Sequence, residues 1–194
     1  MNRRELVQSA ITAGVLSGLP VKAATELPRT PRDYTGPFYP KGPRNPKNDL
    51  IVGEPRAEIL HLSGRVLAPN GSPHPGVLVD IWQTDPNGRY KHPRDREQDN
   101  LMDGFLYWGE ALTDAEARFR FRTYVPGRYA ARPAQHIHYK VWQDRKELLT
   151  SQIYFDELGG ARGLARSERA AALQTVSLER IDDNSVAAGL DIVI

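Results

Sequence analysis

The sequence predicts an all-β fold: a β-sandwich with an extended N-terminal arm and one short surface helix. Short apolar runs recur along the chain and are separated by turn signals such as Asn70-Gly71. Residues 118–124, RFRFRTY, alternate polar and apolar side chains as a half-buried strand does. The chain also holds 16 glycines and 15 prolines in 194 residues, which suits a turn-rich β fold of a single domain.

Residues 1–24 are interpreted as an export signal. Arg3-Arg4 precede a short, modestly apolar run, and the small residues Ala23-Ala24 suit cleavage. The run is too short to cross a bilayer, so we expect no membrane span. The arginine pair is similar to that of a twin-arginine signal, so we expect export to the periplasm or the exterior. The alternative interpretation is an ordinary basic tail.

Charge and cysteine content exclude several kinds of partner and site. Removing residues 1–24 removes three of the 26 basic residues and one of the 24 acidic residues, which leaves equal numbers of each. The balanced charge therefore gives no indication of a nucleic-acid partner. The chain contains no cysteine, which excludes disulfides and cysteine-ligated zinc. Any metal must be bound by histidine, tyrosine, aspartate or glutamate.

Residues 25–57 form the predicted arm, because prolines and charges in this segment disfavour a helix. Its centre, Thr35-Gly36-Pro37-Phe38-Tyr39-Pro40, is aromatic, and we expect it to dock either on its own domain or on a neighbouring copy. Residues 58–194 form the predicted sandwich domain. Its strands are expected over residues 59–67, 76–82, 105–112, 118–124, 136–142, 148–155, 175–181 and 190–194. Residues 161–173, rich in Ala, Arg and Leu, are expected to form the helix.

Two histidines and two tyrosines form a candidate metal site. His136 and His138 lie on the same face of a predicted strand, since successive side chains point to opposite faces. Tyr90 follows an Asp-Pro-Asn-Gly turn and Tyr129 follows Pro-Gly, and the loops of a sandwich gather at its ends. Phenolate and imidazole together suit a hard cation such as Fe(III), and a tyrosine pair is unusual for zinc. Taken singly, each of these residues is more often structural than a metal ligand.

A longer pattern of motifs resembles a known family. It comprises Gly71-x-Pro-x-x-Gly-Val-x-Val-Asp-Ile-Trp-Gln-x-Asp-x-Asn-Gly-Arg-Tyr, Thr113-Asp114, Phe121-Arg122-Thr123, Pro126-Gly127-Arg128-Tyr129, Arg132-Pro133, His136-Ile137-His138 and Gln152-Ile153-Tyr154-Phe155. With Thr35-Gly36-Pro37-Phe38-Tyr39-Pro40 as an active-site arm, roughly residues 33–156 resemble the intradiol ring-cleavage dioxygenases. This is the family of protocatechuate 3,4-dioxygenase and catechol 1,2-dioxygenase.

The resemblance implies a non-haem Fe(III) enzyme. Tyr90, Tyr129, His136 and His138 would be the metal ligands, with Tyr129 and His138 axial. The substrates would be a catechol-type aromatic and O2, and the product a cis,cis-muconate-type diacid that contains both oxygen atoms.

The resemblance also implies roles around the metal. Tyr129, displaced by the substrate, would act as a base, and Arg132 would stabilise developing charge. Tyr39, Phe38 and Gln152 would contact the substrate. Which catechol is used stays open, and a homo-oligomer is possible.

One departure from the family pattern keeps other functions open. The family's arginine usually stands three residues before the first histidine, whereas Gln135 places Arg132 four residues before His136. A β-bulge could absorb the added residue. If it does not, the chain could be a non-catalytic β-sandwich that binds a ligand or a protein. A metal-dependent hydrolase is a third possibility, but no Asp or Glu stands beside His136 and His138 to act as its base.

Overall fold

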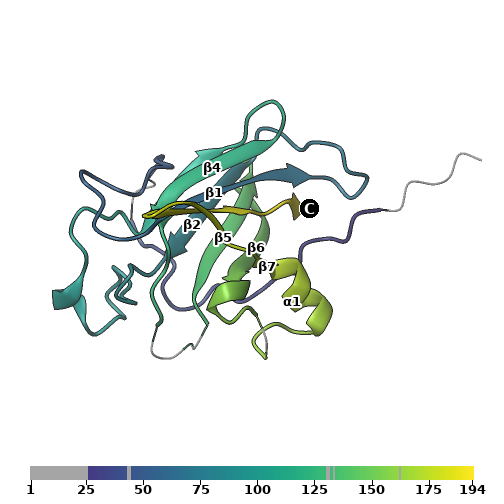
Figure 1. Ribbon diagram of the computed structural model, residues 1–194. Helices are drawn as coiled ribbons and strands as arrows, with labels where there is room; N and C mark the ends of the chain where they lie inside the picture. Colours follow the sequence, from purple (N-terminus) through teal and green to yellow (C-terminus); the bar gives the residue numbers. More distant parts are fainter. Residues whose placement is uncertain (1–25, 43–44, 130–131, 133, 162) are drawn as a thin grey trace, which may run out of the picture.

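The computed structural model describes residues 26–42, 45–129, 132, 134–161 and 163–194, so the expected export signal lies outside the described residues. The described chain forms two β-sheets and one short α-helix, α1 (Glu168–Gln174), which confirms the predicted all-β sandwich (Figure 1). Two 3₁₀ turns, Gln98–Asn100 and Asp156–Leu158, lie in connections. None of the described helices has the length and hydropathy needed to cross a membrane.

The first sheet is built on β1 (Ile59–Leu67). β4 (Arg118–Tyr124) runs antiparallel along one edge of β1, and β9 (Ser185–Gly189) runs parallel along the first half of the other edge. β10 (Ile192–Val193) continues that edge, and β8 (Glu179–Asp182) pairs with β9. Gly64 allows this arrangement, because an added Cβ would lie 1.8 Å from the carbonyl oxygen of Leu190.

The second sheet carries the candidate site. Its strand order is β3 (Trp108–Leu112), β2 (Leu78–Gln83), β5 (His136–Gln143), β6 (Lys146–Phe155) and β7 (Thr175–Val176). The first four strands are antiparallel to one another, and β7 runs parallel to β6. Val79, Ile81, Ile137 and Val141 face the first sheet and belong to the main hydrophobic core. Side chains of the opposite parity face outward.

Several predicted elements differ from the structure at their ends. The strand expected from residue 105 begins at Trp108, because Tyr107 has a φ of 64°, which interrupts an extended chain. Residues 175–181 are divided between β7 and β8, which belong to different sheets. Of residues 190–194 only Ile192–Val193 form a strand, and β9 was not predicted. The helix begins at Glu168 and not at residue 161, because Ser167 caps it by accepting a hydrogen bond from the Ala170 amide.

The arm lies along the outer face of the second sheet. The Asp33 amide donates to the Thr150 carbonyl at 2.9 Å, and the Tyr39 hydroxyl donates to Asp80 on β2 at 2.8 Å. Further on, the Asn45 side chain donates to the Trp108 carbonyl. The arm therefore buries polar side chains that would otherwise be on the surface, and the candidate site is among them.

Candidate metal centre

His136 and His138 lie on the outer face of β5, as predicted. Their Nε2 atoms are 3.2 Å apart, and the two side chains are only 4% and 3% exposed. Ile137 and Tyr139, between and after them, point into the core. The alternation of one strand therefore separates a pair of possible ligands from the hydrophobic interior.

The environment of the histidines favours neutral imidazoles. His136 Nδ1 lies 2.8 Å from the Ala134 carbonyl oxygen. Because a carbonyl oxygen can only accept a hydrogen bond, Nδ1 carries the proton and Nε2 keeps the free lone pair. Burial lowers the pKa of His136 to about 4, with a further lowering by the positive charge of Arg132. Burial also holds the pKa of His138 well below its ordinary value. Both side chains can therefore offer Nε2 to a cation.

Tyr90 reaches the histidines from the turn after β2. The carboxylate of Asp85 accepts hydrogen bonds from the amides of Asn87 and Arg89, and Gly88 takes a φ of 81° to close the turn. The Tyr90 hydroxyl lies 3.5 Å from His136 Nε2. Burial raises the pKa of this phenol well above its ordinary value, although Arg132 opposes the shift. A phenolate at this position therefore requires a cation close by.

Tyr129 is brought to Tyr90 by close backbone packing. An added Cβ on Gly127 would lie 2.3 Å from the carbonyl oxygen of Pro86, so only glycine lets the two turns touch. The Gly127 amide also donates to the Asp85 carbonyl. The rings of Tyr90 and Tyr129 are consequently 5.8 Å apart, centroid to centroid. Two phenols and two imidazoles thus gather at the end of the sheet where β5 begins.

Arg132 lies beside this group despite its unusual spacing. Its guanidinium donates to Gln152 Oε1 at 2.8 Å and to the Tyr154 hydroxyl at 3.3 Å. The additional residue Gln135 turns its amide to the Pro126 carbonyl, to which it donates at 2.7 Å. The loop before β5 therefore absorbs the extra residue, and Arg132 remains close enough to influence the pKa of both histidines.

Gln152, expected near the substrate, has both ends of its amide engaged. Its oxygen accepts from Arg132 and from the Tyr154 hydroxyl, and its nitrogen donates to the Tyr34 carbonyl at 2.8 Å. The side chain is fully buried. In the structure Gln152 therefore joins the arm to Arg132, and its contact with substrate stays a prediction.

The arm forms a wall over the histidines. Gly36 has a φ of 72°, and an added Cβ would lie 3.2 Å from Cε1 of His138. Two residues later, Phe38 stacks on Tyr90 with centroids 4.4 Å apart and contacts the edge of Tyr129 at 5.2 Å. Phe38 thus packs directly against both tyrosines, and its contact with substrate stays a prediction.

Trp82 is a site residue that motif reasoning did not single out. Its indole lies parallel to the His138 ring at 4.9 Å, with an interplanar angle of 6°. Tyr39 packs edge-on against Trp82 at 4.8 Å. Trp82 is the direct partner of His138 across two neighbouring strands. The predicted contact of Tyr39 with substrate stays a prediction.

Asp33 and Gln174 form a hydrogen-bonded pair beside Tyr154, and the sequence did not reveal this pair. The Asp33 carboxylate accepts from Gln174 Nε2 at 2.8 Å and from the Tyr154 hydroxyl at 3.4 Å. Gln174 Nε2 also donates to Ser151. Helix α1 thus contributes a buried side chain, Gln174, that holds the arm in place near Arg132 through its hydrogen bond to Asp33.

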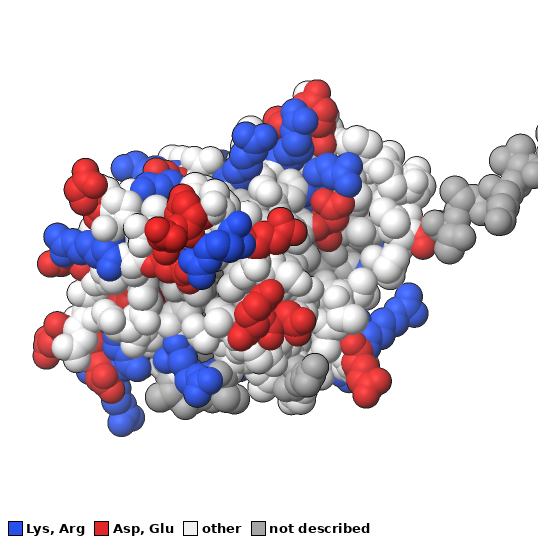
Figure 2. All heavy atoms as spheres, in the orientation of Figure 1, with Lys and Arg blue, Asp and Glu red and all other residues white. Residues whose placement is uncertain are grey.

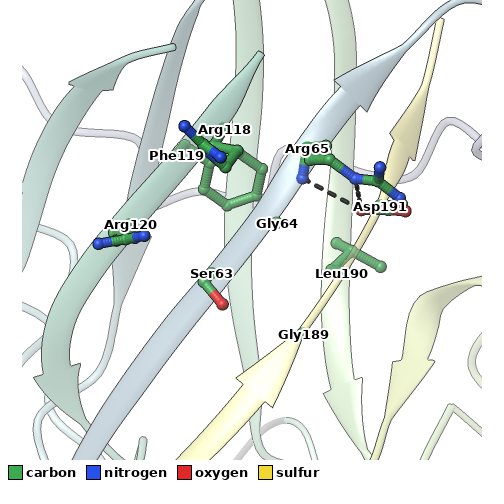
Figure 3. A pocket seen from close by; sticks show the side chains of 9 residues that line it. All are labelled: Ser63, Gly64, Arg65, Arg118, Phe119, Arg120, Gly189, Leu190 and Asp191. Carbon is green, nitrogen blue, oxygen red and sulfur yellow. Dashed lines mark hydrogen bonds and ion pairs between the residues drawn. The ribbon is translucent and has the colours of Figure 1, made fainter. Parts of the chain in front are cut away.

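The other sheet carries a hollow that does not belong to this site. It has a volume of about 500 Å³ and is lined by residues of β1, β4 and the β9–β10 connection, including Ser63, Arg120 and an Arg65–Asp191 ion pair (Figure 3). None of the predicted ligands lines it. On the face shown in Figure 2, basic and acidic side chains are intermingled. Neither observation indicates a second catalytic centre.

The donor set fits a hard trivalent cation. In the described part of the chain no group of three or more His, Asp or Glu residues could hold a metal, so a metal here must use the tyrosines. Tyr90 Oη and the Nε2 atoms of His136 and His138 converge, with Tyr129 beside them. Anionic oxygen and neutral nitrogen donors in a buried site match the requirements of Fe(III).

Fold and site together define a β-sandwich protein in which two tyrosines and two histidines gather at one end of a sheet. The comparisons with known proteins agree: the family model described as "Dioxygenase" matches residues 34–175. The chain belongs to the intradiol ring-cleavage dioxygenase family.

Three relatives illustrate the match. The chain is 36% identical over 150 residues to the protocatechuate 3,4-dioxygenase beta chain of Burkholderia cepacia, covering 70% of this chain but only 63% of that one. It is 31% identical over 168 residues to the alpha chain from the same organism, covering 77% of this chain and 84% of that one. A solved dioxygenase domain of a carbohydrate-binding fusion protein from Streptomyces sp. SirexAA-E is 30% identical, with a TM-score of 0.65, covering 86% and 98% of the two chains.

Proposed function

We propose that the protein is a non-haem Fe(III)-dependent dioxygenase that opens the ring of a catechol-type aromatic between its two hydroxylated carbons. Both atoms of O2 enter the product, a cis,cis-muconate-type diacid. The observation that carries the proposal is the convergence of Tyr90, His136 and His138, with Tyr129 beside them. The printed names of the relatives support the reaction class, since they include dioxygenases of protocatechuate and catechol.

Tyr90, Tyr129, His136 and His138 would hold the iron. When bound, Fe(III) withdraws electron density from a coordinated catecholate, which makes the ring reactive towards O2. The neutral imidazoles of the histidines support this assignment, as do the buried Tyr90 and the partly buried Tyr129 beside them. Burial alone keeps Tyr90 protonated, so its phenolate form depends on the metal.

The remaining steps belong to side chains of the protein. Tyr129, as the phenolate that the metal favours, would accept a proton from a substrate hydroxyl. Arg132, fixed by Gln152 and Tyr154, supplies positive charge where negative charge develops on the substrate. Because Gly36 has no side chain, the arm can pass close to the His138 ring without a clash. Phe38 offers an apolar wall beside both tyrosines. The Trp82 stack shields His138 from water on its other face.

The non-catalytic alternative loses its main support. That reading depended on Arg132 pointing away from the site because of the added Gln135. In the structure Gln135 is absorbed by its hydrogen bond to Pro126, and Arg132 contacts Gln152. The catalytic interpretation therefore needs no special assumption about this loop.

Visible absorption tests the ligand assignment. Protein loaded with Fe(III) should be burgundy, because a phenolate-to-iron charge transfer absorbs visible light. Tyr90→Phe and Tyr129→Phe should each weaken this band, whereas Tyr34→Phe should not, because that ring is 64% exposed. Tyr129→Phe should also slow catechol turnover while leaving thermal unfolding unchanged. An unaltered band in both ligand variants would remove the tyrosines from the centre.

Two further expectations stay predictions. We propose that residues 1–24 direct export; changing Arg3 and Arg4 to lysine should leave the protein in the cytoplasm on cell fractionation, and continued export of this variant would contradict a twin-arginine signal. We also propose a homo-oligomer, which light scattering of the purified protein would test against a monomer of 21.8 kDa.

A further inference from the structure

Tyr90 lies on irregular backbone, whereas the two histidines lie on a strand. β2 ends at Gln83, and the described chain from there to residue 97 forms neither a strand nor a helix. The main chain of the histidines is held by its neighbours, because β5 pairs with β6 at both His136 and His138 and with β2 at His138. A ligand on a loop has no such ladder of hydrogen bonds and is placed less accurately. Tyr90 therefore needs other groups to fix it.

Asp95 holds the amide of Tyr90. Its Oδ2 atom accepts the Tyr90 N–H at 2.8 Å, and its Oδ1 atom accepts the Glu97 N–H at 3.2 Å. The Asp95 side chain is only 3% exposed. The Asp95 amide donates to the His92 carbonyl at 2.9 Å, so the loop folds back and carries the carboxylate to Tyr90. An amide bonds more strongly to a carboxylate than to a neutral acceptor, so this contact can fix the position of Tyr90.

Gln98 holds the carbonyl of the same residue. Its Nε2 atom donates to the Tyr90 carbonyl at 3.0 Å and to the Asp95 carbonyl at 3.0 Å. The His92 amide also donates to the Tyr90 carbonyl, at 2.8 Å. Both main-chain polar groups of Tyr90 are thus bonded within the loop of residues 90–98. These bonds do for this ligand what strand pairing does for the histidines.

Arg89 connects the turn before Tyr90 to the loop after it. Its amide donates to Asp85 at 3.0 Å, and its guanidinium lies 3.5 Å from Asp95 and 2.8 Å from Glu97. The side chains of Arg89 and Asp95 are only 11% and 3% exposed. A buried ion pair contributes little net stability, because both charges lose their water. The pair beside Tyr90 is therefore better explained by the orientation that it gives to the Asp95 carboxylate.

The phenol oxygen of Tyr90 follows its main chain, since the tyrosine ring is rigid. The residue is only 3% exposed, and Phe38 stacks on its ring with centroids 4.4 Å apart, so the ring cannot swing freely to compensate for a displaced backbone. In the structure Tyr90 Oη lies 3.5 Å from His136 Nε2. A misplacement of about 1 Å is enough to spoil a catalytic geometry. The position of the Tyr90 main chain therefore decides whether Tyr90 and His136 can bind the same cation.

We propose that Asp95 and Gln98 are positioning residues of the metal centre. They hold the main chain of Tyr90 so that its phenol oxygen meets the Nε2 atoms of His136 and His138, and they act through Tyr90 and not on the substrate. The inference rests on the proposed function, in which this group of side chains binds Fe(III). Loss of either positioning residue should misplace one ligand and leave the other ligands where they are.

Iron titration and visible spectra of two variants test the inference. Asp95→Ala removes the acceptor of the Tyr90 amide and should lower iron affinity about 10- to 100-fold, the usual effect of losing a group that orients a metal ligand. Gln98→Ala should lower iron affinity about fivefold, as expected for one neutral hydrogen bond. In both variants the visible band should shift or weaken even at saturating iron. Because Gln98 is exposed, its variant should fold even where Asp95→Ala does not.

Two matched variants separate positioning from a general loss of stability. Asp95→Asn keeps one oxygen to accept the Tyr90 amide, so it should retain most of the iron affinity and the visible band. Asp114→Ala is the structural control, because Asp114 likewise accepts two backbone amides, in the turn before β4 of the other sheet. Asp114→Ala should lower thermal stability and leave the visible band unchanged.

Wild-type iron affinity and an unaltered spectrum in Gln98→Ala and in folded Asp95→Ala would overturn the inference. Such a result together with normal catechol turnover would leave the proposed function standing. Altered bands in both variants of a protein that turns over no catechol would contradict the proposed function alone.

Discussion

Gly36 is the residue whose replacement should disturb the metal centre most directly. Its φ of 72° strains any side chain, and an added Cβ would press on His138. Gly36→Ala should lower the free energy of unfolding by about 1–2 kcal/mol and should also weaken iron binding. Gly53→Ala is the matched control, because Gly53 has a φ of 78° and no atom within 4 Å of an added Cβ.

Denaturant unfolding and iron titration of both glycine variants measure the two effects separately. The backbone penalty should be similar in the two variants. The loss of iron affinity should be confined to Gly36→Ala. Equal iron affinity in the two variants would show that the methyl group added at Gly36 does not disturb His138.

Asp80 should make stability depend on pH. Burial raises the pKa of this carboxyl from 3.8 to about 6, even though the Tyr39 hydroxyl and the Trp142 indole donate to it. Because the folded state holds the proton more tightly, the favourable contribution is full below pH 3.8 and is lost as the pH rises through 6. The loss amounts to about 3 kcal/mol.

Urea unfolding at pH 4 and pH 7 checks this sign. Asp80→Asn cannot titrate, so its stability relative to wild type should improve by about 2.5 kcal/mol between these two pH values. A relative stability that is constant, or that worsens with pH, would contradict the assigned shift.

The four predicted ligands could be read from the sequence because each stands in a local pattern. His136 and His138 are two apart on a strand, and Tyr90 and Tyr129 each follow a turn that glycine permits. The neighbours of the ligands could not be read in this way. Asp33 meets Tyr154 across 121 positions of sequence, and only the folded path of the arm brings them together.

At the scale of elements, the Tyr154 hydroxyl links β6 and the arm beside Arg132. It donates to Gln152 at 3.0 Å, with Asp33 the more distant alternative acceptor at 3.4 Å, and it accepts from Arg132. Gln174 of α1 joins this group through its hydrogen bond to Asp33. Tyr154→Phe should lower the free energy of unfolding by about 1–2 kcal/mol, because buried partners lose a hydrogen bond. Catechol turnover should fall as Arg132 loses its position, whereas the visible band of the iron should stay, since Tyr154 is not a predicted ligand.

Steady-state kinetics and visible spectra of Tyr154→Phe provide this test. Tyr34→Phe, which removes an exposed hydroxyl of the arm, is the control. If turnover were unchanged while stability fell, the hydroxyl would serve the fold only. Loss of the visible band would instead indicate that Tyr154 is itself a ligand of the iron.

Strand patterns predicted element type better than element ends. β4 and β5 alternate strongly, and the structure confirms both. β9, SVAAG, is too short and too uniform in side-chain size to signal a strand, and its partners on β1 lie 126 positions away in the sequence. The positive φ of Tyr107 and the cap at Ser167 shift two other boundaries, since both depend on local backbone geometry that composition does not show.

At the scale of the whole molecule, the site lies on the outer face of a sheet and not within the sandwich. Loop clustering at the end of a sandwich had suggested a site on the rim. The structure places Tyr90 and Tyr129 on such loops but the histidines on a strand face, which the arm then covers. The hydrophobic core between the sheets is thus left uninterrupted, and the arm, shown as the dark N-terminal segment in Figure 1, supplies the burial that the site needs.

Oxygen uptake by the iron-loaded protein over a panel of catechols tests the central claim most directly. We expect O2 to be consumed in equal amount to at least one catechol, with isotopic oxygen from O2 recovered in both carboxyl groups of a ring-opened diacid. Arg132→Ala should reduce this uptake, while Arg120→Ala, on the opposite sheet, should not. A fully iron-loaded protein that consumes no O2 with any catechol, or that incorporates oxygen from water alone, would contradict the account.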